Sequence, residues 1–333
     1  MTPPVTLTIA GSDSGGGAGI QADLKAFAAH GCFGTSVITA VTAQNTRGVT
    51  DIHPIPPATV ASQLAAVLDD LPVAAVKTGM LGSPEIADQI VEFARAGRVP
   101  NLVVDPVLVS TTGYELGVVE AIERLLPYAL VVTPNVAEAA ALTGRPVTSP
   151  EEMVEAATAL GERGAQYVVV TGGDLPVPAE EVVEAVWTDG KCELLRGPRV
   201  DSRHNHGSGC TFAATVAAQL AQGASVLDAV KTAKAYVVRA MAGSADWKLG
   251  GGIGPLDHFG WSTPAHLKEE ESVGVGGSPA RHEGGISSRP FRTGGGLRGH
   301  PGAVGGLPGA TPLPGLVAIS VPPLASSPWQ GLL

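Results

Sequence analysis

The chain has 333 residues, of which 44% are hydrophobic and 16% charged, and this composition excludes a chain that is disordered throughout. The length is enough for one large domain, or two ordinary ones, with a sizeable buried core. Its 31 acidic and 21 basic side chains give a formal net charge of −10, which would repel a phosphate backbone, so we expect no nucleic-acid partner.

The three cysteines, Cys32, Cys192 and Cys210, are widely spaced and form no CxxC pair. This pattern favours a reduced compartment over a disulfide framework or a zinc site. The first residues carry no basic segment ahead of an apolar stretch, and no run approaches the roughly 18 apolar residues that span a bilayer. We therefore expect a cytoplasmic protein without a signal peptide or membrane anchor.

Short β-branched runs alternate with amphipathic helical stretches, a pattern typical of repeated βαβ units. The pair Asp189-Gly190 lies between two β-rich runs at 182–188 and 192–195 and signals a type I′ hairpin. The predicted fold is an α/β sheet, mostly parallel, with helices on both faces and an antiparallel hairpin at one end. We expect the other strands at 5–10, 35–40, 74–78, 102–105, 130–133 and 167–171. We expect helices at 17–29, 57–70, 84–96, 115–126, 136–142, 150–163, 209–222 and 225–241.

The composition changes at residue 261, because about a third of the residues from there on are glycine or proline. Such a segment cannot offset its ordering entropy by burial. We therefore expect a folded domain over residues 1–260 and a disordered tail over 261–333, with 315–321 as a weak candidate for a short strand.

Two polar loops follow expected strands near the N-terminus. The loop over 10–23 has glycines that permit close backbone approach to a ligand, and its Asp13 and Asp23 are hydrogen-bond acceptors. Asp23 is equally well explained as a solvated carboxylate at a helix start. The segment 42–48 is rich in amides that suit the edge of a heterocycle, but an ordinary polar loop also explains it.

Polar side chains also end two central strands. Asp105 ends one expected strand, and Asn135 and Glu138 follow the next. The carboxyl ends of parallel strands meet at one edge of a sheet, so these oxygen-bearing groups emerge together in an environment that suits Mg²⁺. Taken alone, Glu138 is better explained as the capping carboxylate of the following helix.

A glycine turn over residues 206–211 opens directly into an alanine-rich helical stretch. The free N–H groups and the helix dipole at such a start form a cradle for a phosphate or oxyanion, although a plain loop with a serine cap explains the spacing equally well. Cys210 lies in the first helical turn, where the dipole favours a thiolate, but a free cysteine is more often a small buried hydrophobic residue. We expect His204 and His206, beside this turn, to face water.

Seven segments stand in an order that is specific to one family. They read AGSDSGGGAGIQADLK at 10–25, TAVTAQNT at 39–46, KTGM at 77–80, DPV at 105–107, TPN at 133–135 with Glu138, GSGCT at 207–211 and GPLDHF at 254–259. Over residues 5–260 the chain thereby resembles the ribokinase-like superfamily and, within it, the hydroxymethylpyrimidine/phosphomethylpyrimidine kinases of thiamine biosynthesis. The resemblance implies a three-layer sandwich and a kinase that uses ATP and Mg²⁺.

The implied substrate is 4-amino-5-hydroxymethyl-2-methylpyrimidine, which would be converted to its monophosphate and then to its diphosphate. Gln44 would read the amino and nitrogen edge of the ring, in a pocket lined by Gly11, Asp23, Gln44, Met80 and Val107. The backbone of Gly207, Ser208 and Gly209 would form the anion hole, and Cys210 would accept the hydroxyl proton. Mg²⁺ would be held by Asp105 and Glu138, largely through water, and the nucleotide by Asp105, Asn135, Glu138, Thr171 and Gly173.

Two segments depart from the family pattern. Thr171 stands where such kinases often have lysine, which removes a cation near the ATP phosphates. The order of residues 203–206 also differs from the usual one, with Arg203 keeping the charge. The alternatives are a pyridoxine or pyridoxal kinase, against which Gln44 argues, and a non-catalytic pyrimidine sensor, against which Cys210 argues. The resemblance to dimeric relatives implies a homodimer.

Overall fold

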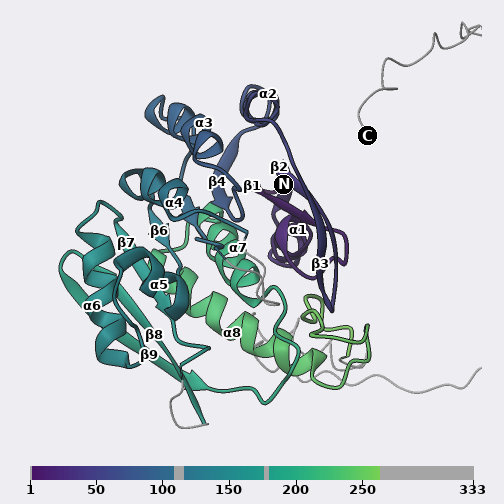
Figure 1. The fold of residues 1–333 in the computed structure, drawn as a ribbon, viewed down its shortest axis with the longest axis vertical. Helices are drawn as coiled ribbons and strands as arrows, with labels where there is room; N and C mark the ends of the chain where they lie inside the picture. Colours follow the sequence, from purple (N-terminus) through teal and green to yellow (C-terminus); the bar gives the residue numbers. More distant parts are fainter. Residues whose placement is uncertain (1, 109–115, 176–179, 263–333) are drawn as a thin grey trace, which may run out of the picture. The chain divides into compact units, whose positions relative to one another are not determined.

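The computed structural model describes residues 2–108, 116–175 and 180–262 (Figure 1). All of them belong to one unit of the chain, residues 1–276. The predicted tail lies outside the described residues except for its first two, as do the expected strand at 315–321 and the first residue of the expected helix 115–126. Among the helices of the described ranges, none has the length and hydropathy of a transmembrane segment.

A nine-stranded sheet forms the middle layer, in the order β3-β2-β1-β4-β5-β6-β7-β8-β9. The hairpin turn between the last two strands has positive φ angles of 48° at Asp189 and 75° at Gly190, as a type I′ turn requires. The parallel part consists of β2 (Phe33–Asn45), β1 (Val5–Asp13), β4 (Val73–Thr78), β5 (Leu102–Val104), β6 (Val131–Val132) and β7 (Tyr167–Thr171). The antiparallel part at this end consists of β8 (Glu181–Thr188) and β9 (Lys191–Pro198), so the predicted fold class is confirmed.

The opposite edge of the sheet differs from the prediction. The segment 42–48 is not a loop, because residues 42–45 continue β2 and β3 (Gly48–Pro54) returns antiparallel to it. None of the residues of β3 is fully buried, so the segment has no hydrophobic alternation that would mark it as a strand. The sheet therefore carries an antiparallel pair at each end.

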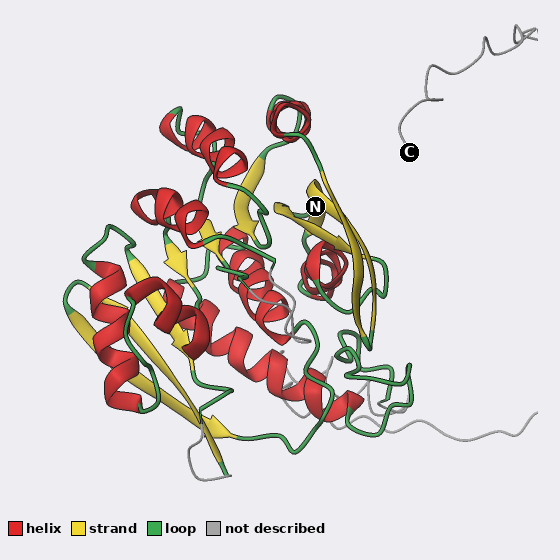
Figure 2. Ribbon diagram, in the orientation of Figure 1, coloured by secondary structure: helices red, strands yellow, loops and turns green. Residues whose placement is uncertain are grey.

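Helices cover both faces of the sheet (Figure 2). Neighbouring strand residues such as Val103 and Val104 face opposite cores, as the period of a strand requires. The first core is shared with α2 (Pro57–Leu68), α3 (Pro84–Arg95), α4 (Val119–Leu125), α5 (Val136–Thr143) and α6 (Pro150–Gly161). The second core is shared with α1 (Gly19–Ala29), α7 (Ser208–Ala221) and α8 (Val226–Ser244). Every expected helix is present, with ends that differ by a few residues.

Candidate active site

A cavity of about 440 Å³ lies at the carboxyl ends of the central parallel strands, where this topology places ligand sites. Loops after β1, β5, β6 and β7 and the start of α7 form its wall. The predicted site residues in this wall are Gly11, Gln44, Met80, Asp105, Val107, Asn135, Glu138, Thr171, Gly207, Ser208, Gly209 and Cys210. Segments separated by up to 199 positions in the chain thus meet at one place.

Two irregularities of the sheet lie at the expected ring-binding residues. The pairing of β1 with β2 shifts register at Gly11, and the pairing of β2 with β3 shifts directly before Gln44. Such bulges re-aim side chains and are common beside active sites. A Cβ at Gly11 would lie 2.4 Å from Cε of Met80, so Met80 reaches the cavity wall over a residue that has no side chain.

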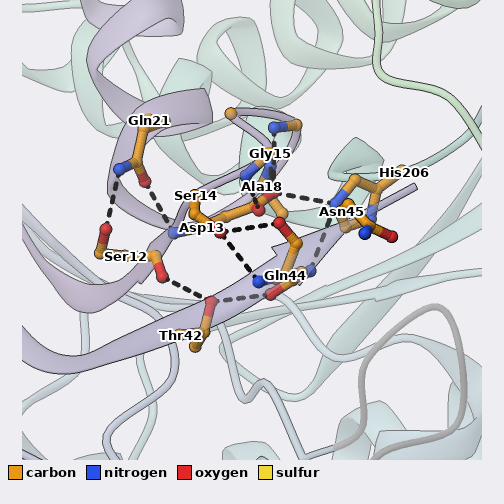
Figure 3. A network of polar contacts seen from close by, with 12 residues as sticks. Ser12, Asp13, Ser14, Gly15, Ala18, Gln21, Thr42, Gln44, Asn45 and His206 are labelled. Atoms are coloured by element: carbon orange, nitrogen blue, oxygen red, sulfur yellow. Dashed lines mark hydrogen bonds and ion pairs between the residues drawn. The ribbon is translucent and has the colours of Figure 1, made fainter. Parts of the chain in front are cut away.

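The Asp13 carboxylate organises the loop between β1 and α1 (Figure 3). It accepts hydrogen bonds from the backbone N–H groups of Gly15 at 2.8 Å, Gly17 at 2.9 Å and Ala18 at 2.8 Å. Nε2 of His206 lies 3.0 Å from the Asp13 Oδ2. Burial opposes the charge, but His206 and the N–H donors hold the pKa of Asp13 below its usual value. Asp13 is therefore an ionised acceptor that joins two loops.

Both histidines that the sequence predicted to face water are buried. His206 is 6% exposed and lines the cavity. His204 is 2% exposed, accepts the Gly254 N–H with its Nδ1 at 2.9 Å and donates from Nε2 to the Trp247 carbonyl at 2.9 Å. The prediction was wrong because the partners of both rings come from segments far away in the chain, which the local sequence does not indicate.

A buried ion-pair network lies beside the cavity. The Lys77 ammonium donates to both carboxylate oxygens of Asp23 at 3.0 Å and lies 3.3 Å from Oδ2 of Asp105. Burial opposes the charge of Lys77, but the two carboxylates raise its pKa, so Lys77 stays protonated. Asp23 is 0% exposed and does not line the cavity. Asp23, which was expected to line the ring pocket, therefore lies outside the cavity wall, where its carboxylate anchors Lys77.

Cys210, in the first turn of α7, lies in the field of this network. Burial raises the pKa of its thiol, and the charges of Asp105 and Asp23 act in the same direction. Lys77 and the Gly19 N–H oppose them without reversing the shift. The helix dipole, which favours a thiolate, is therefore outweighed first by burial and then by two carboxylates from other parts of the chain.

Asn135 and Glu138 form a capping box at the start of α5. The Asn135 Oδ1 accepts the N–H of Glu138, and the Glu138 Oε2 accepts the N–H of Asn135, each at 2.9 Å. The carboxyl of Glu138 also lines the cavity, so its capping role and its place in the site hold together. Burial, followed by the charge of Asp105, raises the pKa of Glu138 to about 8.

The acidic pair Asp105 and Glu138 fits a divalent cation. A cation near both groups would relieve the repulsion that raises the pKa of Glu138, and carboxylate oxygens are the donors that Mg²⁺ prefers. Within the described ranges, no group of three His, Cys, Asp or Glu side chains is placed to hold a metal ion by itself. The pair would therefore need water or ligand oxygens to complete the coordination of Mg²⁺.

A second cavity of about 190 Å³ adjoins the first, and both have Asn135, Thr171, Ser208 and Gly209 in their walls. Parts of β8 and α8 form its far side, and Gly173, which the first cavity lacks, lines it. The start of α7 thus stands between two hollows, one larger and one smaller.

Two cations line the second cavity. Arg199 donates to the carbonyl oxygens of Gly173 at 2.7 Å and Leu175 at 3.3 Å. Lys234 donates to the Val182 carbonyl at 3.1 Å and pairs with Glu184. Arg203, which the sequence suggested as the remaining charge, is exposed and lines neither cavity. Arg199 is the arginine next to the Thr171-Gly172-Gly173 turn.

A family model described as phosphomethylpyrimidine kinase matches residues 13–257, which include both cavity walls except Gly11 and Ser12. The chain belongs to the phosphomethylpyrimidine kinase family. A hydroxymethylpyrimidine/phosphomethylpyrimidine kinase of Streptomyces coelicolor is 49% identical over 267 residues, which are 79% of this chain and 96% of that protein. The family that the seven sequence segments indicated is thereby confirmed.

Two further proteins similar to this chain are a longer enzyme and a kinase named for another substrate. A chloroplastic thiamine biosynthetic bifunctional enzyme of Arabidopsis thaliana is 50% identical over 77% of this chain, which spans 50% of that protein. The solved structure of pyridoxal kinase from Staphylococcus aureus in complex with AMP-PCP and pyridoxal has a TM-score of 0.71 and 38% identity. That match covers 78% of this chain and 95% of the other, and it confirms the ribokinase-like fold.

Proposed function

We propose that this protein transfers the γ-phosphoryl group of ATP to 4-amino-5-hydroxymethyl-2-methylpyrimidine, and then to the resulting monophosphate, in thiamine diphosphate biosynthesis. The observation that carries the proposal is the meeting of Gln44, Met80, Cys210 and the start of α7 in one cavity. Relatives named for this activity support it, since one of them is 49% identical over 96% of its length.

The acceptor would occupy the larger cavity and ATP the smaller one. Both cavities reach Ser208 and Gly209, so the transferring phosphoryl group would lie over the start of α7. The backbone N–H groups and the helix dipole there would stabilise the charge that spreads over the phosphoryl oxygens. Gly207 permits this turn, because its φ is +82° and a Cβ would lie 1.9 Å from the Gly17 carbonyl oxygen.

The remaining nucleotide contacts follow from the shared wall. We assign Asn135, Thr171 and Gly173 to ATP, with Arg199 and Lys234 as the nearby cations. Asp105 and Glu138 would hold Mg²⁺, largely through water, and the bound ion would neutralise charge on the ATP phosphates. The complex of a related pyridoxal kinase with AMP-PCP supports the use of ATP.

We assign Cys210 as the acceptor of the hydroxyl proton. It lines the larger cavity beside the proposed anion hole, with the charge of Lys77 and the Gly19 N–H as the groups that favour its thiolate. Because burial raises the pKa of the thiol well above its usual value, only a small fraction of Cys210 is thiolate near neutrality, and we expect kcat/KM to keep rising with pH above neutrality. The substrate proton would move to Sγ while the substrate oxygen attacks the γ-phosphorus and ADP leaves.

The deciding experiment is an ADP-release assay with the aminopyrimidine alcohol, ATP and Mg²⁺, in which the phosphorylated products are counted by mass. We expect mono- and diphosphate products from the wild type and a loss of roughly 10²–10⁴-fold in kcat for Cys210→Ala. Turnover that survives this substitution would move catalysis to the anion hole and Mg²⁺. Binding detected by thermal stabilisation without any ADP release would contradict the enzyme and favour a sensor.

A pyridoxal kinase is the second candidate, favoured by the structural likeness to the Staphylococcus aureus enzyme. The ratio of kcat/KM for the aminopyrimidine alcohol and for pyridoxal separates the two, and we expect it to favour the pyrimidine. The resemblance also supports a homodimer and a cytoplasmic location. Light scattering after size-exclusion chromatography and cell fractionation test these two proposals.

A further inference from the structure

Gln44 is held along its whole length (Figure 3). Its backbone N–H donates to the Ser14 hydroxyl at 2.8 Å, and its carbonyl accepts from the same hydroxyl at 2.7 Å. One end of its carboxamide lies 3.3 Å from the Thr42 Oγ1, and the other end lies 3.4 Å from Nε2 of His206. The position of the Gln44 amide in the cavity wall is therefore fixed. What these contacts leave open is which end of the amide is the oxygen and which is the NH₂ group, because a half-turn about the Cγ–Cδ bond exchanges the two.

The hydrogen atoms of its two neighbours decide that half-turn. The Thr42 hydroxyl has one hydrogen, which it donates to the Ser12 carbonyl at 2.8 Å, so it offers Gln44 a lone pair. His206 Nε2 lies 3.0 Å from Asp13, which accepts three backbone N–H groups and is a pure acceptor when ionised. Nε2 must therefore carry its one hydrogen, which it donates mainly to Asp13. A protonated ring nitrogen has no lone pair, so at 3.4 Å it can only share that hydrogen with an acceptor of Gln44 and cannot accept from an N–H group.

Only one orientation of the Gln44 amide satisfies both neighbours. Its NH₂ group must lie next to Thr42 and its oxygen next to His206, which exchanges the two ends shown in Figure 3. In the other orientation two N–H groups would face each other at His206. We propose that His206, held by Asp13, is a positioning residue that fixes the order of donor and acceptor that Gln44 presents to the acceptor ring.

This order gives the cavity its selectivity, and the inference rests on the proposed function of the same site. A 4-aminopyrimidine presents a ring nitrogen that accepts beside an amino group that donates. Its 4-oxo analogue presents a ring N–H that donates beside an oxygen that accepts, which is the reverse. A fixed amide pairs fully with one order and leaves polar groups unpaired with the other, and unpaired buried groups are the strongest source of discrimination.

The test compares kcat/KM for 5-hydroxymethyl-2-methylpyrimidine with a 4-amino and with a 4-oxo group. We expect His206→Ala to lower the amino-to-oxo ratio about tenfold or more, mainly through a higher KM for the amino compound, because the amide is then free to turn. His206→Gln keeps an N–H donor at this place and should keep most of the wild-type ratio. His53→Ala, on the exposed face of β3, is the matched control and should change nothing.

A second variant guards against loss of folding, which the unfolding temperature of each variant monitors. Thr42→Val removes the acceptor at the other end of the amide and should lower the ratio as His206→Ala does. An unchanged ratio in folded His206→Ala protein overturns the inference, as does an equal loss in His206→Gln. If the wild type turns over neither compound, the proposed function fails as well, so the two failures are distinguishable.

Discussion

The two adjoining cavities are built by different means. Around the larger cavity, ionisable groups are buried and paired with distant segments, as Lys77 is with Asp23 and Asp105. The smaller cavity has one such pair, Lys234 with Glu184, but its other cation, Arg199, is held by main-chain carbonyls alone among its described contacts. Buried pairs fix atoms within a small tolerance, whereas a carbonyl-held arginine keeps donors for phosphate oxygens.

This difference predicts large effects at the first cavity and small effects at the second. Lys77→Met is expected to have the largest, because it leaves two buried carboxylates without their cation. Breaking a buried pair in this way costs about 3–5 kcal/mol of unfolding free energy, and we expect that loss in urea unfolding at pH 7. Lys231→Met, at an exposed lysine of α8, is the control. A loss of unfolding free energy below about 1 kcal/mol would contradict this expectation. It would show that Asp23 and Asp105 do not depend on Lys77 to remain buried.

The next effect concerns the pH dependence of stability on the buried side of α7. His258 Nε2 lies 3.0 Å from the Thr211 hydroxyl, and burial, aided by the charge of Lys25, lowers the pKa of His258 to about 4. Between pH 6.5 and 4 the unfolded chain then binds more protons than the folded one, so stability falls as the pH falls. The expected contribution of His258 is roughly 3 kcal/mol over this window.

Urea unfolding of wild type and His258→Gln at several pH values from 7 to 4.5 measures this contribution, because the other carboxyl and histidine groups titrate in both proteins. We expect the variant to be less stable at pH 7 and to lose less stability on acidification. If the two proteins lose the same unfolding free energy on acidification, protonation of His258 does not destabilise the folded state. That result would weaken the contrast between the buried groups near α7 and the partly exposed Arg199.

The smallest effect is expected at the second cavity. Arg199→Met should raise the KM for ATP by roughly fivefold at saturating acceptor, as expected for one partly exposed charge worth about 1 kcal/mol. Arg203→Met should leave this KM unchanged, since Arg203 lines neither cavity. A raised KM for ATP in Arg203→Met with an unchanged KM in Arg199→Met would contradict the assignment of Arg199. It would support Arg203, which the sequence suggested, as the cation near ATP.

Much of this molecule follows from its sequence. The central strands and the helices carry hydrophobic periodicity, and the pair Asp189-Gly190 demands a hairpin because both residues need positive φ angles. The resemblance of seven short segments pointed to about half of the residues that line the larger cavity. These features are local, or they are fixed by the order of motifs along the chain.

What the sequence did not predict depends on partners from distant segments. The buried His206 is partnered by Asp13, which lies 193 positions away, and the raised pKa of Cys210 comes from burial, with two carboxylates outside α7 acting in the same direction. Asp23 was expected in the substrate pocket from the resemblance, and its partner Lys77 lies 54 positions away, where the local sequence of Asp23 gives no sign of it. The edge strand β3 was missed for another reason, since a strand that buries neither face has no periodic pattern.

The contact between the first glycine loop and the turn before α7 also bears on the order in which the protein is made. Gly17 packs against the ring of His206 and the side chain of Pro255, and His206 bridges to Pro255. A loop that leaves the ribosome early in the synthesis of this domain thus waits for residues some 240 positions later before its final contacts exist. The sheet can begin to assemble during synthesis, but the acceptor cavity is completed only near the end of the domain.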